Sequence, residues 1–143
     1  MTFWIGRFII EWIAWLIVAD KSRWREILPV CLLASYISLI ADQLCELFKL
    51  WEYYPNDSIA DLLNAFGIYM IATYLFIQWF PHHKTFSNRF RYLFYWTTIA
   101  ISIEFMHVYL GYMGHLNWNY GYSYVADWIL FWVFYNFYFA IKK

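Results

Sequence analysis

Five long apolar segments run through the chain, separated by short stretches that carry charges, prolines and other polar residues. They cover residues 3–19, 27–48, 62–80, 92–113 and 124–141. Each is close to the ~20 residues that an α-helix needs to cross a hydrocarbon core of ~30 Å. The short connections indicate that consecutive helices are antiparallel neighbours. The pattern therefore predicts an all-α fold, a compact five-helix transmembrane bundle that forms a single integral-membrane domain over residues 1–143.

The composition excludes an ordinary soluble domain. Apolar residues make up 64% of the chain and charged residues only 14%, against about 25% charged residues in a typical soluble domain. The 10 Trp and 14 Tyr are residue types that gather at membrane–water interfaces. The net charge is zero, which gives no reason to expect a nucleic-acid partner. Membrane lipid is the expected partner.

Basic residues predict which ends of the helices face the cytoplasm. They gather in the first and third connections and at the C-terminus, as Lys21, Arg23 and Arg25, Lys84, Arg89 and Arg91, and Lys142 and Lys143. The second connection has Lys49 among several acids, and the fourth has no basic residue. Because cytoplasmic loops are enriched in Lys and Arg, we expect the N-terminus outside and the C-terminus in the cytoplasm. Arg7 is the one exception to this bias.

The fourth segment carries two ionisable residues near its middle. Glu104 and His107 are three positions apart and therefore share a helix face, together with His115 further along. A charged side chain at the centre of a bilayer costs roughly 2.5–3.5 kcal/mol on insertion scales. Such a residue needs a partner, and the candidate partners lie on the other helices.

Other ionisable residues gather at the same depth as Glu104, between mid-bilayer and the outer surface. We therefore predict one shared, buried polar site in the outer half of the bundle, made of Glu11, Asp42, Glu46, Glu104, His107 and Asp127. Simpler explanations exist for two members. Glu46 can reach interfacial water, and Asp127 lies in a first helical turn, which favours an acid. Arg7 and Glu11 are expected to find partners on neighbouring helices.

The fourth connection predicts an extended strip. Trp118, Tyr120, Tyr122 and Tyr124 alternate with other residues, and alternation with period two is typical of extended backbone. We expect a turn near Gly121, so that the strip lies over the outer mouth of the bundle, as a cover for a site or as an interfacial anchor.

Several strings in the chain resemble a family. ADKSRWREILP, LWEYYP, TYLFIQWFP and YVADWILFWVFY together look like an uncharacterised family of small multi-spanning membrane proteins from spore-forming Gram-positive bacteria. The resemblance covers essentially the whole chain. It implies a multi-pass protein of the bacterial cell membrane and transfers no catalytic residue.

Four functions remain open at this point, and whether the chain is an enzyme is undecided. An interaction or structural membrane component is the first, since buried ionic groups can fix helix register and partner choice. A divalent metal ion is the possible cofactor of the second, with the ligand set Glu104, His107, His115 and Asp42. A proton-coupled carrier, which would need a homo-oligomer or a partner protein, is the third. An enzyme that modifies lipid, with Glu104 or Asp42 as general acid, is the fourth.

Overall fold

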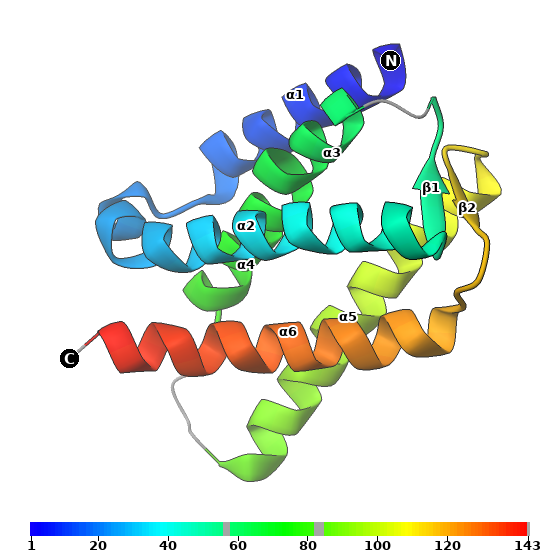
Figure 1. The fold of residues 1–143 in the computed structure, drawn as a ribbon. Coiled ribbons are helices and arrows are strands. Elements are labelled where there is room, and N and C mark those ends of the chain that lie inside the picture. Colours follow the sequence, from blue (N-terminus) through cyan, green and yellow to red (C-terminus); the bar gives the residue numbers. More distant parts are fainter. Residues whose placement is uncertain (56–57, 82–84, 143) are drawn as a thin grey trace.

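The computed structural model describes residues 1–55, 58–81 and 85–142. Within them, five helical rods follow one another along the chain (Figure 1). They are α1 (Thr2–Val18), η1 (Lys21–Arg23) with α2 (Trp24–Phe48), α3 (Ser58–Asn64) with η2 (Ala65–Tyr69) and α4 (Met70–Gln78), α5 (Phe86–Tyr109) and α6 (Tyr120–Ile141). Two short strands, β1 (Trp51–Tyr53) and β2 (Met113–His115), complete the described part. The predicted all-α class is confirmed.

Local capping sets helix ends that the hydropathy pattern placed differently. α5 begins at Phe86 rather than at residue 92, because the Thr85 side chain accepts a hydrogen bond from the backbone N–H of Asn88. The same helix ends at Tyr109, four residues before the predicted end. Gly111 follows with φ 77°, a conformation that glycine adopts readily and that stops a helix.

The third rod contains a π-helical turn at Ala65–Tyr69. A π-turn leaves backbone carbonyls without their regular helical partners. Side chains from two other rods supply replacements: Ser35 Oγ donates to Ala65 O at 2.7 Å, and Trp12 Nε1 donates to Phe66 O at 3.1 Å. Neighbouring helices therefore stabilise this turn.

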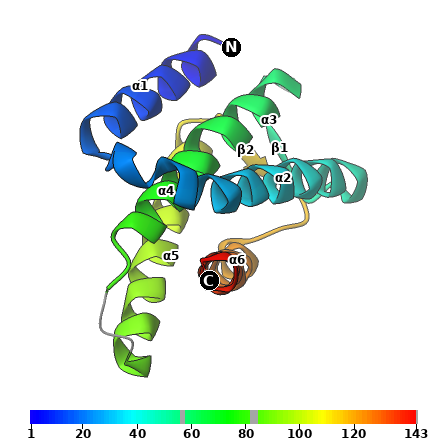
Figure 2. The same ribbon diagram turned by 90° about the vertical axis from the view of Figure 1, so that its left-hand side faces the viewer.

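Consecutive rods run in opposite directions, so the two chain termini lie at opposite ends of the bundle (Figure 1). At one end, Trp4 Nε1 of α1 donates to Tyr54 O after β1. At the other end, Lys142 after α6 pairs with Glu26 of α2 at 3.1 Å. α5 is tilted against the other rods, and its N-terminal part projects from the bundle (Figure 2). We call the end with the N-terminus and the strands the strand end, and the other end the C-terminal end.

The two strands form an antiparallel pair at the strand end, with Trp51 opposite His115 and Tyr53 opposite Met113. The predicted extended strip is therefore wrong over most of its length. Asn119 caps α6 by accepting the backbone N–H of Tyr122 at 3.0 Å, so the helix already includes Gly121. An N-cap asparagine satisfies a free amide of the first turn, and here this outweighs the alternation of aromatic residues.

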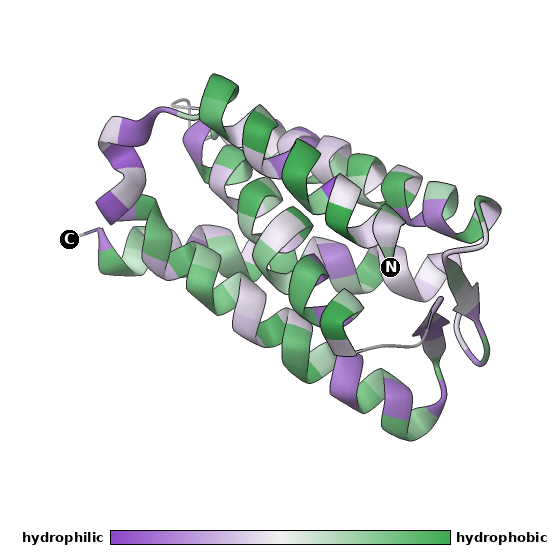
Figure 3. Cartoon of the chain, turned by 90° about the horizontal axis from the view of Figure 1, so that it is seen from above, coloured by the Kyte–Doolittle hydropathy of each residue, from purple (hydrophilic) through white to green (hydrophobic). Residues whose placement is uncertain are grey.

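The apolar core occupies the half of the bundle near the C-terminal end. Its bulky members include Trp15, Ile27, Phe76, Phe80, Phe131 and Tyr138. The outer surface is apolar as well. Ile10 and Ile17 of α1 are 67% and 77% exposed, and hydrophobic residues cover the sides of the helices while hydrophilic ones gather toward the ends (Figure 3). A soluble protein rarely exposes such continuous apolar surface.

Three helices of the described chain are long and apolar enough to cross a membrane: Lys21–Phe48, Ser58–Gln78 and Tyr120–Ile141. α1 has 17 residues, and α5 has 24 residues with a more polar sequence. Basic residues lie at the helix ends that face the C-terminal end of the bundle: Lys21 and Arg23 in η1, Arg25 at the start of α2, Arg89 and Arg91 near the start of α5, and Lys142 just after α6. Lys84 and Lys143 lie outside the described residues.

Candidate polar site at the strand end

Arg7 lies at the centre of the first of two polar clusters. Its guanidinium contacts side chains from three rods: Glu11 of α1 at 2.8 Å, Asn64 Oδ1 of α3, and His107 Nε2 of α5 at 2.8 Å. Only 14% of the Arg7 side chain is exposed. The five N–H groups of a guanidinium suit several acceptors at once, so Arg7 joins α1, α3 and α5 through one side chain.

Aromatic rings close this cluster toward the strands. The Trp4 ring stacks against the His107 ring at 5.6 Å and lies 4.9 Å from the Arg7 guanidinium carbon. A cation over an indole face is stabilised, more so where water is excluded. Trp4 is fully buried, so it shields the charge of Arg7 from solvent.

Glu11 lies between Arg7 and the π-turn of the third rod. A Cβ atom at Gly67 would approach Glu11 Oε2 to 2.5 Å, so only glycine leaves room for this carboxylate. Glu11 Oε2 is buried and has no hydrogen bond among the described residues. The expectation of partners on other helices is therefore confirmed for Arg7, which contacts Asn64 and His107. Glu11 instead pairs with Arg7 inside α1, because the same guanidinium also reaches Glu11.

Glu104 lies at the centre of the second cluster. Its Oε1 atom is 2.7 Å from His115 Nε2 and accepts a hydrogen bond from Ser123 Oγ at 2.7 Å. Trp118 Nε1 donates to Ser123 Oγ in turn, also at 2.7 Å. This cluster joins α5, β2 and α6. The side chains of Glu104 and His115 are 15% and 13% exposed, so the pair is largely withdrawn from solvent.

Asp42 occupies a third position, beside β1. The side chains of Trp51 and Tyr53 are directed at its carboxyl group as donors, although Asp42 Oδ2 and Trp51 Nε1 lack hydrogen bonds of normal geometry among the described residues. Burial, and then the electrostatic effects of Tyr69 and Asp42, raise the pKa of the Tyr53 hydroxyl well above its ordinary value. Tyr53 is thus a neutral donor next to Asp42.

Tyr69, the last residue of the π-turn, links these groups. It interacts electrostatically with Asp42, Asp127, Glu104 and Arg7, which belong to four different rods. Asp127 also interacts with Glu104. Tyr69 and Ser123 were not predicted as members of the site. Ser123 precedes Asp127 by one helical turn and shares its face, a signal that the sequence does contain. The π-turn that places Tyr69 has no signature in the hydropathy pattern.

Five of the six residues of the predicted polar site lie at the strand end, although hydrogen bonds group them into separate clusters rather than into one site. Glu11, Asp42, Glu104, His107 and Asp127 lie there, but Glu46 is exposed and lies outside these clusters. The buried face of α2 passes through Ser38, Asp42 and Cys45, and Glu46 lies at the edge of that face in the last turns of the helix, where its carboxylate reaches water.

The predicted metal-ligand set is not brought together. Within the described chain, no group of three His, Cys, Asp or Glu side chains could hold a metal ion. Glu104 and His115 lie together, whereas His107 contacts the positively charged Arg7 and Asp42 lies beside β1. Among the residues that the structure describes, the hydrogen-bond partners of His107 and Glu104 include no acid of α2 or α6.

Comparison with known proteins found no family model that matches the chain, no similar curated protein and no similar solved structure.

Proposed function

We propose that the chain is a five-span protein of the bacterial cell membrane, with its N-terminus outside and its C-terminus in the cytoplasm. Two properties support this. Three helices have the length and hydropathy of membrane spans, and exposed isoleucines run along α1 from Ile5 to Ile17. The helix ends that carry most of the basic residues lie at the C-terminal end of the bundle (Figure 1), which agrees with the bias of cytoplasmic loops.

Within the membrane, we propose that the protein acts as an interaction or structural component. The observation that carries this proposal is the set of contacts of Arg7. One buried guanidinium is engaged by Glu11, Asn64 and His107 from three rods, which leaves it few N–H groups for a substrate. Such a group fixes the register of helices that otherwise meet through non-directional apolar packing.

A carrier is supported less well by this arrangement. A carrier needs its polar path to reach both membrane faces, and transporters commonly place the binding site near the midplane. Here the ionisable groups lie at the strand end, while bulky residues such as Trp15, Phe76 and Phe131 fill the core toward the C-terminal end. The ionisable groups therefore form no polar path from the strand end to the C-terminal end among the described residues, as a carrier would need.

Reporter fusions test the orientation. Fusions at Ser22 and Ser87 should report the cytoplasm, and a fusion at Asn119 should report the outside. A cytoplasmic signal at Asn119 would overturn the proposed sidedness.

Photo-crosslinking in intact cells tests the interaction role. A photoreactive residue is introduced at Ile9 of α1 or at Ile129 of α6, which are 52% and 55% exposed. A surface that contacts a protein partner or a second copy should give one discrete adduct of higher mass. Lipid adducts alone at both positions would contradict the interaction role and leave the orientation untouched.

A further inference from the structure

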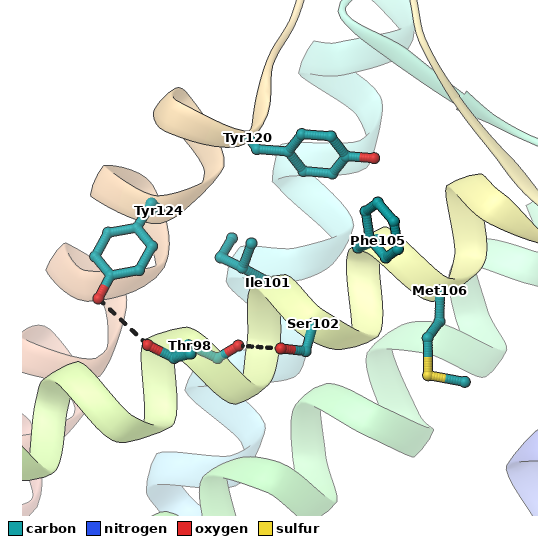
Figure 4. Close-up of a pocket in the computed structure, with 7 residues that line it drawn as sticks. All are labelled: Thr98, Ile101, Ser102, Phe105, Met106, Tyr120 and Tyr124. Atoms are coloured by element: carbon teal, nitrogen blue, oxygen red, sulfur yellow. Dashed lines mark hydrogen bonds between the residues drawn. The ribbon is translucent and has the colours of Figure 1, made fainter.

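A groove runs between α5 and α6 on the apolar surface of the bundle. It has a volume of about 440 Å³ and is lined by Thr98, Ile101, Ser102, Phe105, Met106, Tyr120 and Tyr124 (Figure 4). These residues come from two rods that pack against each other. The groove is thus open to whatever surrounds the helices, which is lipid in a membrane-spanning bundle.

Two hydroxyl groups in the body of this groove, those of Thr98 and Ser102, already donate to the helix backbone. Thr98 Oγ1 donates to Phe94 O at 2.8 Å. Ser102 Oγ donates to Thr98 O at 2.8 Å, and Tyr124 Oη lies 3.5 Å from Thr98 Oγ1 (Figure 4). Hydroxyls that are satisfied by the helix backbone offer little to a polar ligand. The body of the groove therefore suits an alkyl chain rather than a sugar or a peptide.

The end of the groove nearest the strands has a different character. There Tyr120 lines the groove, and its ring contacts the ring of His115 at 4.7 Å and the ring of Phe105 at 6.0 Å. Tyr120 also interacts electrostatically with Glu104. The apolar groove and the Glu104 cluster thus share Tyr120 as a common wall.

The Glu104 carboxyl group lies beside this end, next to His115. Glu104 has His115 and Ser123 as partners, both on Oε1, and its other oxygen accepts none of the hydrogen bonds of the described residues. Asp127 adds a second carboxyl group that interacts with Glu104. Arg7 is a cation at the same end of the bundle, but its guanidinium already contacts Glu11, Asn64 and His107.

From these observations we propose that the groove binds a single-chain amphiphile with a primary ammonium head group. The alkyl chain lies along Ile101 and Tyr124, and the ammonium group lies at the Tyr120 end, near the Glu104 carboxylate. A carboxylate with aromatic rings beside it is the chemistry that stabilises an alkylammonium ion. A fatty acid would instead bring a second carboxylate next to that of Glu104. The inference depends on the proposed membrane-spanning arrangement and goes beyond the proposed interaction role.

Photolabelling of the full-length protein tests the proposal. The protein is placed in nanodiscs made of a lipid without net charge. Three probes share one diazirine-bearing alkyl chain and differ only in the head group: a primary amine, an alcohol and a carboxylic acid. The amine should label residues of the groove at least about fivefold more than the alcohol at equal concentration, and the acid should label least. Excess unlabelled alkylamine should remove the label.

Two variants separate the head group from the chain. Glu104→Gln keeps a side chain that hydrogen-bonds but removes the charge, so the amine and the alcohol should then label equally. Ser102→Trp fills the groove and should reduce labelling by all three probes, whereas Ile13→Trp, on an exposed position of α1, should leave it unchanged.

Equal labelling by all three probes in the unaltered protein would show an ordinary lipid-facing depression and overturn the proposal, as would strongest labelling by the acid. Adducts that map outside α5 and α6 would overturn it as well. None of these outcomes depends on the fusion reporters, so a failure of the proposed orientation would be recognised separately.

Discussion

Arg7 and His107 meet at 2.8 Å between Nη1 and Nε2, and this contact determines the protonation state of the histidine. A guanidinium carries only N–H groups and can only donate. His107 Nε2 is therefore the acceptor, and the ring is neutral with its proton on Nδ1. Protonation of His107 would place two cations in contact inside the bundle. The contact is compatible only with this one tautomer.

Replacement of Arg7 should destabilise the protein strongly. Arg7→Met leaves Glu11, Asn64 and His107 without their shared donor, and breaking a buried ion pair typically costs roughly 3–5 kcal/mol. Thermal unfolding of the detergent-solubilised protein measures the effect. Arg91→Met, at an exposed position whose partners are local to α5, should change the melting temperature little.

Arg7→Lys adds a second test of the same contacts. One ammonium group cannot reach three acceptors in different directions, so this variant should also be destabilised. If Arg7→Lys melted like the unaltered protein, the role of Arg7 as a connector of three rods would be refuted.

Gly67→Ala should destabilise by roughly 1–3 kcal/mol, the usual cost of an overpacked core. The added Cβ would lie 2.5 Å from Glu11 Oε2 and 3.0 Å from Phe8 Cδ2, so the carboxylate would have to leave its place beside Arg7. Gly6→Ala is the matched control, because nothing lies within 4 Å of a Cβ there. Alanine should stabilise α1 at that position by about 0.5–1 kcal/mol. Equal effects of the two changes on the free energy of unfolding would contradict the close approach of Glu11.

Ser35→Ala and Ser38→Ala should differ, although both residues lie on α2 and are 2% and 5% exposed. Ser35 Oγ donates to Ala65 O in the π-turn, and an orphaned buried acceptor costs about 1–3 kcal/mol. Ser38 Oγ is a buried hydroxyl without a hydrogen bond in the described chain, so its removal should be neutral or stabilising. A larger loss of melting temperature for Ser38→Ala would show that Ser35 does not support the π-turn.

Asp20 should stabilise the first connection in a pH-dependent way. Hydrogen bonds from the Ser22 side chain, and then from its backbone N–H, lower the pKa of the Asp20 carboxyl group below its ordinary value. A lowered pKa in the folded state means that the contribution is present above the unfolded-state pKa of about 3.9 and is lost as the pH falls through the folded-state value.

The difference in melting temperature between the unaltered protein and Asp20→Asn should therefore be largest near neutral pH and should become smaller in acid. Ser22→Ala should reduce that difference at neutral pH, since it removes the main cause of the lowered pKa. A difference that grows in acid would have the wrong sign for this explanation.

The long-range arrangement was predictable from the sequence where it depends on hydropathy and charge. The five apolar segments became the five rods, and the basic connections came together at the C-terminal end. The positions of Glu11, Asp42, Glu104, His107 and Asp127 along their predicted membrane spans indicated that these residues lie at the other end. The individual pairs were not predictable, because a stripe on one helix does not say which neighbour it faces. The pairing of Glu104 with His115 rather than with an acid is an example.

Two further features depend on contacts that no local pattern contains. The π-turn at Ala65–Tyr69 is supported by Ser35 and Trp12 from other rods, and neither residue has an unusual position in its own helix. The pairing of β1 with β2 joins residues about sixty positions apart through three-residue strands, which are too short to show a period of two.

The position of the two termini constrains how this fold could be duplicated. An odd number of alternating rods leaves the chain at the end opposite to where it began (Figure 1). If two copies were joined head to tail by a short linker, the second copy would start at the C-terminal end of the first and would run upside down relative to it. A simple tandem fusion would thus produce a pair of inverted repeats, the symmetry found in many secondary transporters, while a pair with both copies upright would need one additional crossing between them.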